Sequence, residues 1–563
     1  MNVCQALLNM SDKGKLISRF YRMEGLTMSS KLLKGTAILT IGLFLSKALG
    51  LLYVIPFYAI VGEDHVTLYQ YAYIPYNIAL SIAIAGAPLA ISKFVARYNA
   101  MGDYAMGRRL LKGSMGIMML TGVASFLILY FLAEPIAHMV IKDKEQLFTT
   151  NDIATVIRWV SYALIVVPVM SVVRGFLQGY GKMEPTAVSQ LIEQIVRIVV
   201  VLAGALVVVN FLHGSQKVAV NFAVFAATIG SIASLGVLYW YWRKYKPEFD
   251  YLLSTSTSSG EVPVKDITTE LITYIIPFVL VGVINPLYQM IDMLTFNAAM
   301  KDIGLSNVSD TYLGMLNFTT HKLVMIPVMV ATGFSMALIP VITEYFTKQD
   351  HTGLKNALDQ TYQIMIFLTV PMVTGIAVLS APLYHALFKE SSVGAMILGN
   401  YAPVAILFGL YTVTAAILQG IDRQKWIIFT SLLGLFIKLV LNIPLIKLME
   451  TNGAILATAI GYGVAVGLNI IIISIAMEYR SKLVIRRTIL IALLNLAMFI
   501  AVFFTLRGLI ALQPAGGKLH ALLYVFICTV VGVAVYGYLS LKTGLVQKLF
   551  GDRIKRITSK FGF

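Results

Sequence analysis

Charged side chains and cysteines are scarce in this sequence. Only 13% of its 563 residues are charged, whereas 58% are hydrophobic. Soluble domains carry about 25% charged residues, so this composition excludes a string of such domains and favours a polytopic membrane protein. The chain has 2 cysteines, Cys4 near its start and Cys528 inside an apolar run, which excludes a disulfide framework and a cysteine metal site.

Acidic residues are the scarcer charge type, with 27 Asp and Glu against 44 Lys and Arg. In a soluble protein, the resulting net charge of +17 would suggest a nucleic-acid partner. Here the basic residues lie mainly between apolar runs, where they set the orientation of membrane helices. Nucleic acid is therefore not an expected partner.

The first residues lack the pattern of a signal peptide. Residues 1–31 contain several basic side chains but no apolar segment followed by a small-residue cleavage site. Met28, directly before SSKLLKG, is a second candidate start, which would make residues 1–27 an extension.

Apolar runs between polar breaks predict fourteen transmembrane helices, and hence an all-α polytopic membrane fold. Six form a first group, at 32–61, 74–98, 110–141, 154–181, 186–211 and 218–242. Six more form a second group, at 267–299, 311–345, 357–388, 394–421, 426–448 and 453–478. Two remain, at 487–511 and 519–541. The predicted domains are an N-terminal extension (1–31), an N-lobe (32–243), a cytoplasmic linker (244–266), a C-lobe (267–480), a pair of C-terminal helices (481–547) and a basic tail (548–563).

The two six-helix groups resemble repeats of one another. A shift of 241 residues superposes the LQG sequence at 177–179 on that at 418–420, and a shift of 247 superposes Asp103 on Asp350. Each group has an even number of helices, so the repeats are expected to be parallel, two pseudo-symmetric bundles related by an axis along the membrane normal. Transporters built in this way bind their substrate between the lobes and rock the lobes to alternate access.

Basic residues predict the orientation of the helices. Most Lys and Arg fall in segments that are cytoplasmic if the N-terminus is inside, notably 108–113, 480–487 and 548–560. The positive-inside rule therefore places both termini in the cytoplasm. The predicted outer loops are short, so they leave no room for an extracytoplasmic catalytic domain.

A few ionisable side chains fall inside predicted helices, where a charge facing lipid costs at least ~2.5 kcal/mol. They are Lys47, Arg174, Glu193, Arg197, Asp292, Lys322 and Lys438. Glu193 and Arg197 have the i,i+4 spacing of an intrahelical pair. Asp292 and Lys438 lie at similar predicted depth, which favours a salt bridge between their helices. Such a pair fits a gate and a static brace equally well.

Lys47 and Lys322 have no acidic residue within one turn of their own helices, and His321 adjoins Lys322. Lys47 and Lys322 thus lie deep in the membrane on helices of opposite groups. This placement predicts a water-filled cavity that attracts an anion, because a lysine binds phosphate with three donors. The alternative is that backbone carbonyls satisfy both ammonium groups. No metal site is expected, because the remaining histidines are scattered near helix ends.

The last two helices differ from the rest. Residues 488–506 and 521–541 contain no charged side chain and fall outside both repeats. They are candidates for a groove that holds a long lipid chain, with lipid-facing padding or a dimer contact as the alternatives.

Several motifs resemble those of a known family. LSKALG at 45–50, HKLVMIP at 321–327, the repeated LQG and the 6 + 6 + 2 helix plan are similar to the MurJ/YtgP lipid II flippases of the MOP exporter superfamily. SpoVB proteins and polysaccharide flippases are neighbours in that superfamily. The resemblance extends from Met28 to the tail. It implies two bundles in a V around a central cavity, with the polyprenyl tail in a groove on the last two helices.

The resemblance also implies roles for individual residues. Basic side chains of helices 1, 2 and 8 line the family's cavity, and Lys47 and Lys322 stand at matching positions. Tyr53 stands where many relatives have a second arginine, and the nearest bases of helix 2 are Lys93 and Arg97. The candidate substrate-binding residues are Lys47, Lys322, His321, Arg174, Arg197, Lys93 and Arg97. The candidate coupling or gating residues are Asp292, Lys438 and Glu193. Some relatives hold sodium among helices 7, 11 and 12, and Lys438 near that region argues against sodium here.

The implied function is that of a flippase, not an enzyme, with no cofactor. It would move undecaprenyl-diphosphate disaccharide-pentapeptide between leaflets of a bacterial plasma membrane, with membrane lipids and cell-wall synthesis proteins as further partners. One alternative is a flippase for another polyprenyl-linked polysaccharide, or a sporulation-specific role. A multidrug antiporter of the same superfamily is a less favoured alternative. Such an antiporter usually has twelve helices and an acidic cavity, whereas this sequence predicts fourteen helices and a basic cavity. A membrane glycosyltransferase would need catalytic carboxylates or histidines on a substantial loop, and none is apparent.

Overall fold

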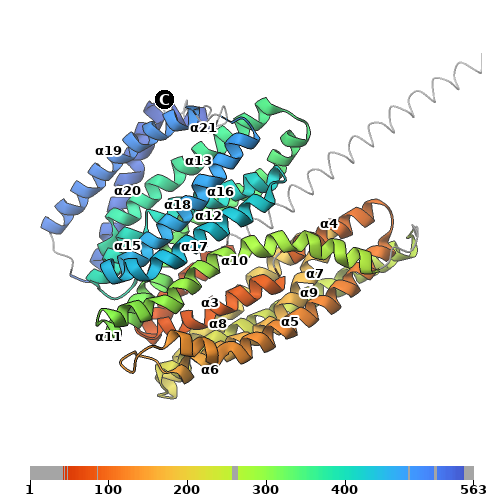
Figure 1. The fold of residues 1–563 in the computed structure, drawn as a ribbon, viewed down its shortest axis with the longest axis horizontal. Coiled ribbons are helices and arrows are strands. Elements are labelled where there is room, and N and C mark those ends of the chain that lie inside the picture. The colour runs from red at the N-terminus through yellow and green to blue at the C-terminus, as the bar shows by residue number, and fades with distance from the viewer. Residues whose placement is uncertain are drawn as a thin grey trace, which may run out of the picture.

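The fold consists of two helical bundles that lie side by side (Figure 1). The computed structural model describes residues 42, 45–46, 48–84, 86–256, 264–479, 482–512 and 516–550. Within these ranges, regular structure is helical and no strand occurs. The bundles approach one another near α11 and α15 and spread apart toward α4, which gives the V shape implied by the family resemblance (Figure 1).

The first bundle contains the helices before residue 256. They are α2 (Val54–Val61), α3 (Val66–Ile84), α4 (Ala87–Ala100), α5 (Tyr104–Val140), α6 (Thr150–Ser161), α7 (Ala163–Gly179), α8 (Glu184–Leu206), the π-helical η1 (Val207–Phe211) and α9 (Gln216–Ser254). α3 and α4 form one bent crossing, and Gly86 between them adopts φ 73°, a left-handed conformation that suits glycine.

The second bundle begins with α10 (Val264–Asp302), which packs on α17 of the same bundle and on α3 and α5 of the first. Its other helices are α11 (Ser306–Gly314), the π-helical η2 (Met315–Thr320), α12 (His321–Thr347), α13 (His351–Val378), α14 (Ser380–Leu387), α15 (Ser392–Tyr401), α16 (Val404–Gly420), α17 (Gln424–Met449) and α18 (Thr451–Ala476). Outside it lie α19 (Lys482–Leu512), α20 (Lys518–Lys542) and α21 (Leu545–Phe550), at the edge away from the first bundle (Figure 1).

The number of membrane crossings agrees with the prediction from the sequence. Twelve spans in the described residues are long and apolar enough to cross a bilayer, and a shorter apolar helix covers Ala48–Val61. The 39-residue α10 adds the first crossing of the second bundle. The predicted all-α polytopic fold, with two six-helix bundles and two C-terminal helices, is therefore confirmed.

The two bundles share details that support an internal repeat. Asp103 and Asp350 are both N-caps of a third crossing, accepting hydrogen bonds from Met106 N (3.0 Å) and Gly353 N (2.8 Å). The fourth crossing of each bundle is split into two helices, α6 with α7 and α15 with α16, and each second helix ends in LQG. The pairs superposed by the sequence offsets therefore have the same structural roles.

Several helices extend beyond their predicted spans, and α9 and α3 do so by the most residues. α9 continues to Ser254, so the N-terminal half of the predicted linker 244–266 is helical. Its polar extension is stabilised by the Arg108–Asp250 ion pair at 3.0 Å and by Phe249, which is buried. α3 begins at Val66 rather than at 74, because its polar and aromatic first turns are buried within the protein instead of facing lipid.

Two glycines set the distance between α17 and α18. A Cβ atom at Gly461 would lie 2.6 Å from Gly434 O and 2.7 Å from Tyr288 Oη, whereas nothing lies within 4 Å of the same position at Gly463. Small residues permit this close helix packing in membranes.

We expect Gly461→Ala to lower the free energy of unfolding by about 1–3 kcal/mol, because the added methyl group overpacks the helix interface. Gly463→Ala, two residues away on the same helix, is the control and should leave stability unchanged or slightly raised. Thermal unfolding of purified protein in detergent measures both. Equal stabilities of the two variants would contradict the proposed contact.

Candidate functional site

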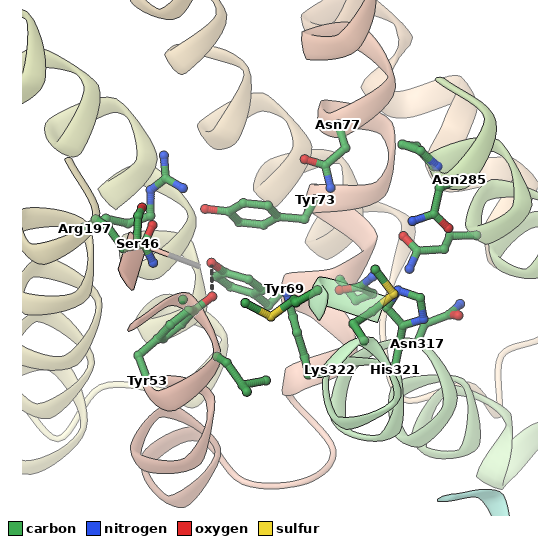
Figure 2. Close-up of a pocket in the computed structure, with 18 of the residues that line it drawn as sticks. Ser46, Tyr53, Tyr69, Tyr73, Asn77, Arg197, Asn285, Asn317, His321 and Lys322 are labelled. Atoms are coloured by element: carbon green, nitrogen blue, oxygen red, sulfur yellow. Dashed lines mark hydrogen bonds between the residues drawn. The ribbon is translucent and has the colours of Figure 1, made fainter. Parts of the chain in front are cut away.

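A cavity of about 450 Å³ lies between the two bundles. Its lining comes from α3 and α8 on one side and from α10, η2 and α12 on the other (Figure 2). Uncharged polar side chains are frequent in this lining: Asn77, Gln194, Asn285, Gln289 and Asn317. Polar groups at this depth are costly in a bilayer, so their convergence indicates a water-filled site for a polar ligand.

Two predicted cations reach this cavity from opposite bundles. Lys322 lies on the first turn of α12 and Arg197 lies on α8, and both line the cavity (Figure 2). In the part of the chain that the structure describes, Lys322 Nζ has no hydrogen-bond or ion-pair partner. His321 also lines the cavity, and its Nδ1 lies 3.0 Å from Tyr401 Oη, a contact that fixes its imidazole ring.

Several cavity donors lack a partner among the described residues. They are Arg197 Nε, Asn317 Nδ2 and the Tyr73 hydroxyl, all buried. Leaving a buried donor unsatisfied costs about 1–3 kcal/mol. Together with Lys322, these groups present an arrangement of donors that an anionic, oxygen-rich ligand would satisfy. No carboxylate occurs among the described lining residues.

Glu193 joins two arginines beside the cavity. Its carboxylate accepts from Arg197 Nη2 at 2.8 Å, as the i,i+4 spacing predicted, and from Arg174 Nη2 at 3.0 Å. Arg174 also donates to Ser189 and Ser234, so it links α7, α8 and α9. Arg174 does not line the cavity, because its guanidinium is directed into the first bundle. One carboxylate shared by two guanidinium groups leaves a net positive charge next to the cavity.

The remaining candidate cations of the first bundle lie elsewhere. Lys93 and Arg97 are exposed on α4, beyond the bend at Gly86, and do not line the cavity. Lys47 lies outside the described residues. Its neighbour Ser46 and Gly50, one turn further along the chain, both line the cavity. Tyr53, at the position where many relatives have an arginine, lines it as well.

The salt bridge expected between Asp292 and Lys438 is present, with 2.7 Å between Oδ1 and Nζ. Lys438 is fully buried and also donates to Thr458 Oγ1 at 2.6 Å, while Asn442 Nδ2 donates to Asp292 Oδ1 at 3.0 Å. The pair joins α10 to α17 and α18 within the second bundle. It does not line the cavity, and the ammonium takes the place at Asp292 that a free cation would occupy.

A contact that sequence reasoning missed closes one end of the cavity. The Asp310 carboxylate is buried and accepts from the Tyr71 hydroxyl, from Asn297 Nδ2 at 3.1 Å and from Leu147 N at 3.0 Å. Thr67 Oγ1 donates to Asp310 O at 2.8 Å. These groups, the Asp310 latch, join α3 and the α5–α6 loop of the first bundle to α10 and α11. Asp310 precedes the predicted helix 311–345 by one residue, so the sequence places it in a loop, whereas it lies within α11.

Aromatic side chains pack in and beside the cavity lining, and some of them join the two bundles. The hydroxyls of Tyr53 and Tyr69 lie 3.0 Å apart, and the rings of Phe57 and Phe318 pack 6.4 Å apart across the bundle interface. Outside the spans, burial raises the pKa of Glu63, and nearby Lys389 of the second bundle opposes the rise. This end of the molecule is therefore closed by successive layers of contacts.

Replacing Lys438 by Met should lower the free energy of unfolding by about 3–5 kcal/mol, because the change leaves the Asp292 carboxylate buried without its cation. The double variant Asp292→Asn/Lys438→Met removes both charges and should recover most of the loss. Thermal unfolding in detergent gives the comparison. A double variant that is no more stable than the single one would show that the ion pair is not the source of the effect.

Comparison with known proteins gives consistent matches. The family described as polysaccharide biosynthesis protein matches residues 32–346, and the MatE family matches 277–444. The chain is 44% identical to the lipid II flippase MurJ of Bacillus subtilis (strain 168), over 94% of this chain and 98% of that protein. It is 26% identical to stage V sporulation protein B of the same organism, over 72% of this chain and 76% of that protein.

Solved structures with the same fold have low sequence identity to this chain. A lipid II flippase MurJ in an inward closed conformation is 15% identical, with a TM-score of 0.64 over 90% of this chain and 99% of that one. An inward-facing multidrug resistance MATE transporter of the MOP superfamily is 16% identical, with a TM-score of 0.61 over 77% of this chain and 94% of that one.

Proposed function

Since this chain belongs to the polysaccharide biosynthesis protein family and, within it, to the family of the lipid II flippase MurJ, we propose that it flips lipid II. The substrate would be undecaprenyl-diphosphate disaccharide-pentapeptide, moved from the inner to the outer leaflet of a bacterial plasma membrane. As a multi-pass membrane transporter, the protein would change the position of the lipid and break none of its bonds.

The observation that carries the proposal is the set of unpartnered donors in the cavity. A diphosphate is a dianion with several acceptor oxygens, and Lys322, Arg197 and Asn317 offer cationic and amide donors toward one space. Hydrogen bonds to charged groups are about twice as strong as neutral ones. The amide side chains around them suit sugar hydroxyls.

The charge distribution supports an inward-facing state. α5 connects the two ends of the first bundle. Its first turns, from Tyr104, contain the basic segment 108–113. Its last residue is Val140, whose carbonyl accepts a hydrogen bond from Asn297 Nδ2 of the latch region at 3.3 Å. The positive-inside rule assigns the basic end to the cytoplasm, so the Asp310 latch would face outside. The headgroup would then enter from the cytoplasm, and opening of the latch would release it on the other side.

The C-terminal helices suit the lipid tail. α19 and α20 expose large apolar side chains along their length, among them Leu493, Phe504, Phe526 and Val533. We assign the undecaprenyl chain to this surface, since it presents no charge between residues 488 and 506 or between 521 and 541. The prenyl chain could then remain in the membrane while the headgroup crosses.

Coupling to sodium at Asp292 is disfavoured, because Lys438 already supplies the positive charge there. The membrane potential is worth ~2.3 kcal/mol per charge per 100 mV, and the cavity cations are groups on which it could act. A role as an exporter of cationic drugs is disfavoured too, because a basic cavity repels cations.

We expect Lys322→Ala to reduce lipid II flipping at least about tenfold, because removal of one charge-assisted contact costs roughly 1.5–3 kcal/mol. Lys322→Arg should retain part of the activity. Lys348→Ala, which removes an exposed lysine at the end of the same helix, is the control. The measurements are lipid II accessibility at the outer leaflet and complementation of a strain depleted of its flippase. Full activity of Lys322→Ala at normal expression would refute the role.

The latch makes a separate prediction. With both native cysteines replaced by serine and a cysteine placed at Asn317, Asp310→Ala should increase labelling by a membrane-impermeant maleimide added outside. The control is Asp302→Ala, since Asp302 pairs with Lys447 at 2.6 Å on the same side of the interface. Labelling that is unchanged in Asp310→Ala, or raised equally in Asp302→Ala, would contradict the gating role.

A further inference from the structure

A second cavity, of about 800 Å³, lies between the first turns of α13 and α19. In the described residues it shares no lining residue with the central cavity and includes none from the first bundle. We call it the α13–α19 groove. It is defined by His351, Lys355, Asn356 and Asp359 of α13 and by Lys482 and Arg486 of α19.

The groove is strongly basic. Lys355, Lys482 and Arg486 are exposed, and among the described residues none of the three has an ion-pair or hydrogen-bond partner. The one carboxylate of the described lining, Asp359, is buried and accepts a hydrogen bond from the Tyr479 hydroxyl. Three cations from two helices therefore face a shared space with one carboxylate, and an anion in that space would relieve their mutual repulsion.

Hydrogen bonds fix the two walls of the groove. Arg487 Nη1 donates to Gln363 Oε1, and about two to three turns further along the two helices, Asn495 Nδ2 donates to Thr374 Oγ1 at 2.9 Å. Gln360 Nε2 donates to Leu549 O at 3.2 Å, which brings α21 alongside α13. The spacing of the cations is therefore set by packed helices and not by long side chains on an open surface.

The position of the groove indicates a lipid and not a free ion. Next to Lys482 and Arg486, α19 exposes Leu483, Ile485 and Ile489, whose exposed fractions are 43%, 56% and 57%. The cations thus lie at the boundary between a polar surface and an apolar one, where a phosphate headgroup and its acyl chains would meet. An ion such as inorganic phosphate would use only the polar half of this surface.

The groove lies at the end of the second bundle that the positive-inside rule assigns to the cytoplasm. α12 and α16 both end there, with Thr343 Oγ1 donating to Gly420 O at 3.2 Å, and α13 begins four residues after α12 ends. Anionic lipids give the cytoplasmic leaflet a negative surface potential, and basic pockets between helices on that side bind their headgroups.

We propose that the α13–α19 groove binds the phosphate headgroup of an anionic phospholipid of the cytoplasmic leaflet. Lys355, Lys482 and Arg486 would contact the phosphate, and the acyl chains would lie along the apolar face of α19. The lipid would connect the second bundle to the C-terminal helix pair. This site is independent of the cavity assigned to lipid II.

The test measures lipid binding to the full-length protein by native mass spectrometry, with phosphatidylglycerol and phosphatidylcholine as probes. Lys355→Gln/Lys482→Gln/Arg486→Gln removes the groove charges, and Lys355→Arg/Lys482→Arg/Arg486→Lys keeps them. Lys112→Gln/Arg423→Gln/Lys425→Gln, which removes three exposed cations from the same end of the molecule, is the matched control.

We expect the wild type to prefer phosphatidylglycerol over phosphatidylcholine at least about tenfold. The neutral groove variant should lose about 10- to 100-fold in affinity for phosphatidylglycerol, since each basic side chain contributes separately. The charge-keeping variant and the matched control should stay within about twofold of the wild type. Binding of lipid II by the neutral variant should persist, which separates this proposal from that of lipid II transport.

Three results would overturn the proposal. The first is unchanged phosphatidylglycerol binding in the neutral groove variant, or an equal loss in the matched control. The second is a loss in the charge-keeping variant as large as that in the neutral one. The third is displacement of phosphatidylglycerol by an equal concentration of inorganic phosphate, which would identify the groove as a site for a free anion.

Discussion

The cost of placing a charge in the low-dielectric interior of a membrane determines how this protein is organised. Asp292 and Lys438 remove that cost by pairing with each other, and Glu193 does so for two arginines at once. These groups act as braces within a bundle. Lys322 has no such partner in the described structure, and it lies where the bundles leave room for water or a ligand.

The Asp310 latch at the closed end of the cavity is made of hydrogen bonds, and a partly exposed ion pair between Lys301 and Asp143, at 3.5 Å, lies near it. Asp310 accepts from a hydroxyl, an amide and a backbone N–H group, and each of these groups can exchange the carboxylate for water when the bundles separate. The net free energy of such an exchange is small, roughly 0.5–1.5 kcal/mol per hydrogen bond. A contact of this kind suits a gate that must open and close repeatedly.

Much of the architecture could be predicted from the sequence, because long apolar runs and the scarcity of charge leave few alternatives. The Glu193–Arg197 and Asp292–Lys438 pairs could be predicted from spacing and depth. Asp310 could not, because α11, the short helix that contains it, is largely polar and cannot be told from a loop in the sequence. The amide and tyrosine lining of the cavity was missed as well, because uncharged polar side chains give little signal within an apolar run. The contacts of Arg174, a candidate substrate-binding residue, with Glu193, Ser189 and Ser234 within the first bundle could not be predicted either, because they depend on how α7, α8 and α9 pack.

Two residues of α10, a little more than one turn apart, attach this helix to different partners. Asp292 ties it to α17 and α18, whereas Asn297 ties it to the latch across the interface. The Asp292 attachment is a buried ion pair, whereas the Asn297 attachment is an amide hydrogen bond. The hydrogen bond is the weaker of the two, so it would break first. If the bundles separate, α10 would therefore remain with α17 and α18, held there by the Lys438 ammonium at Asp292.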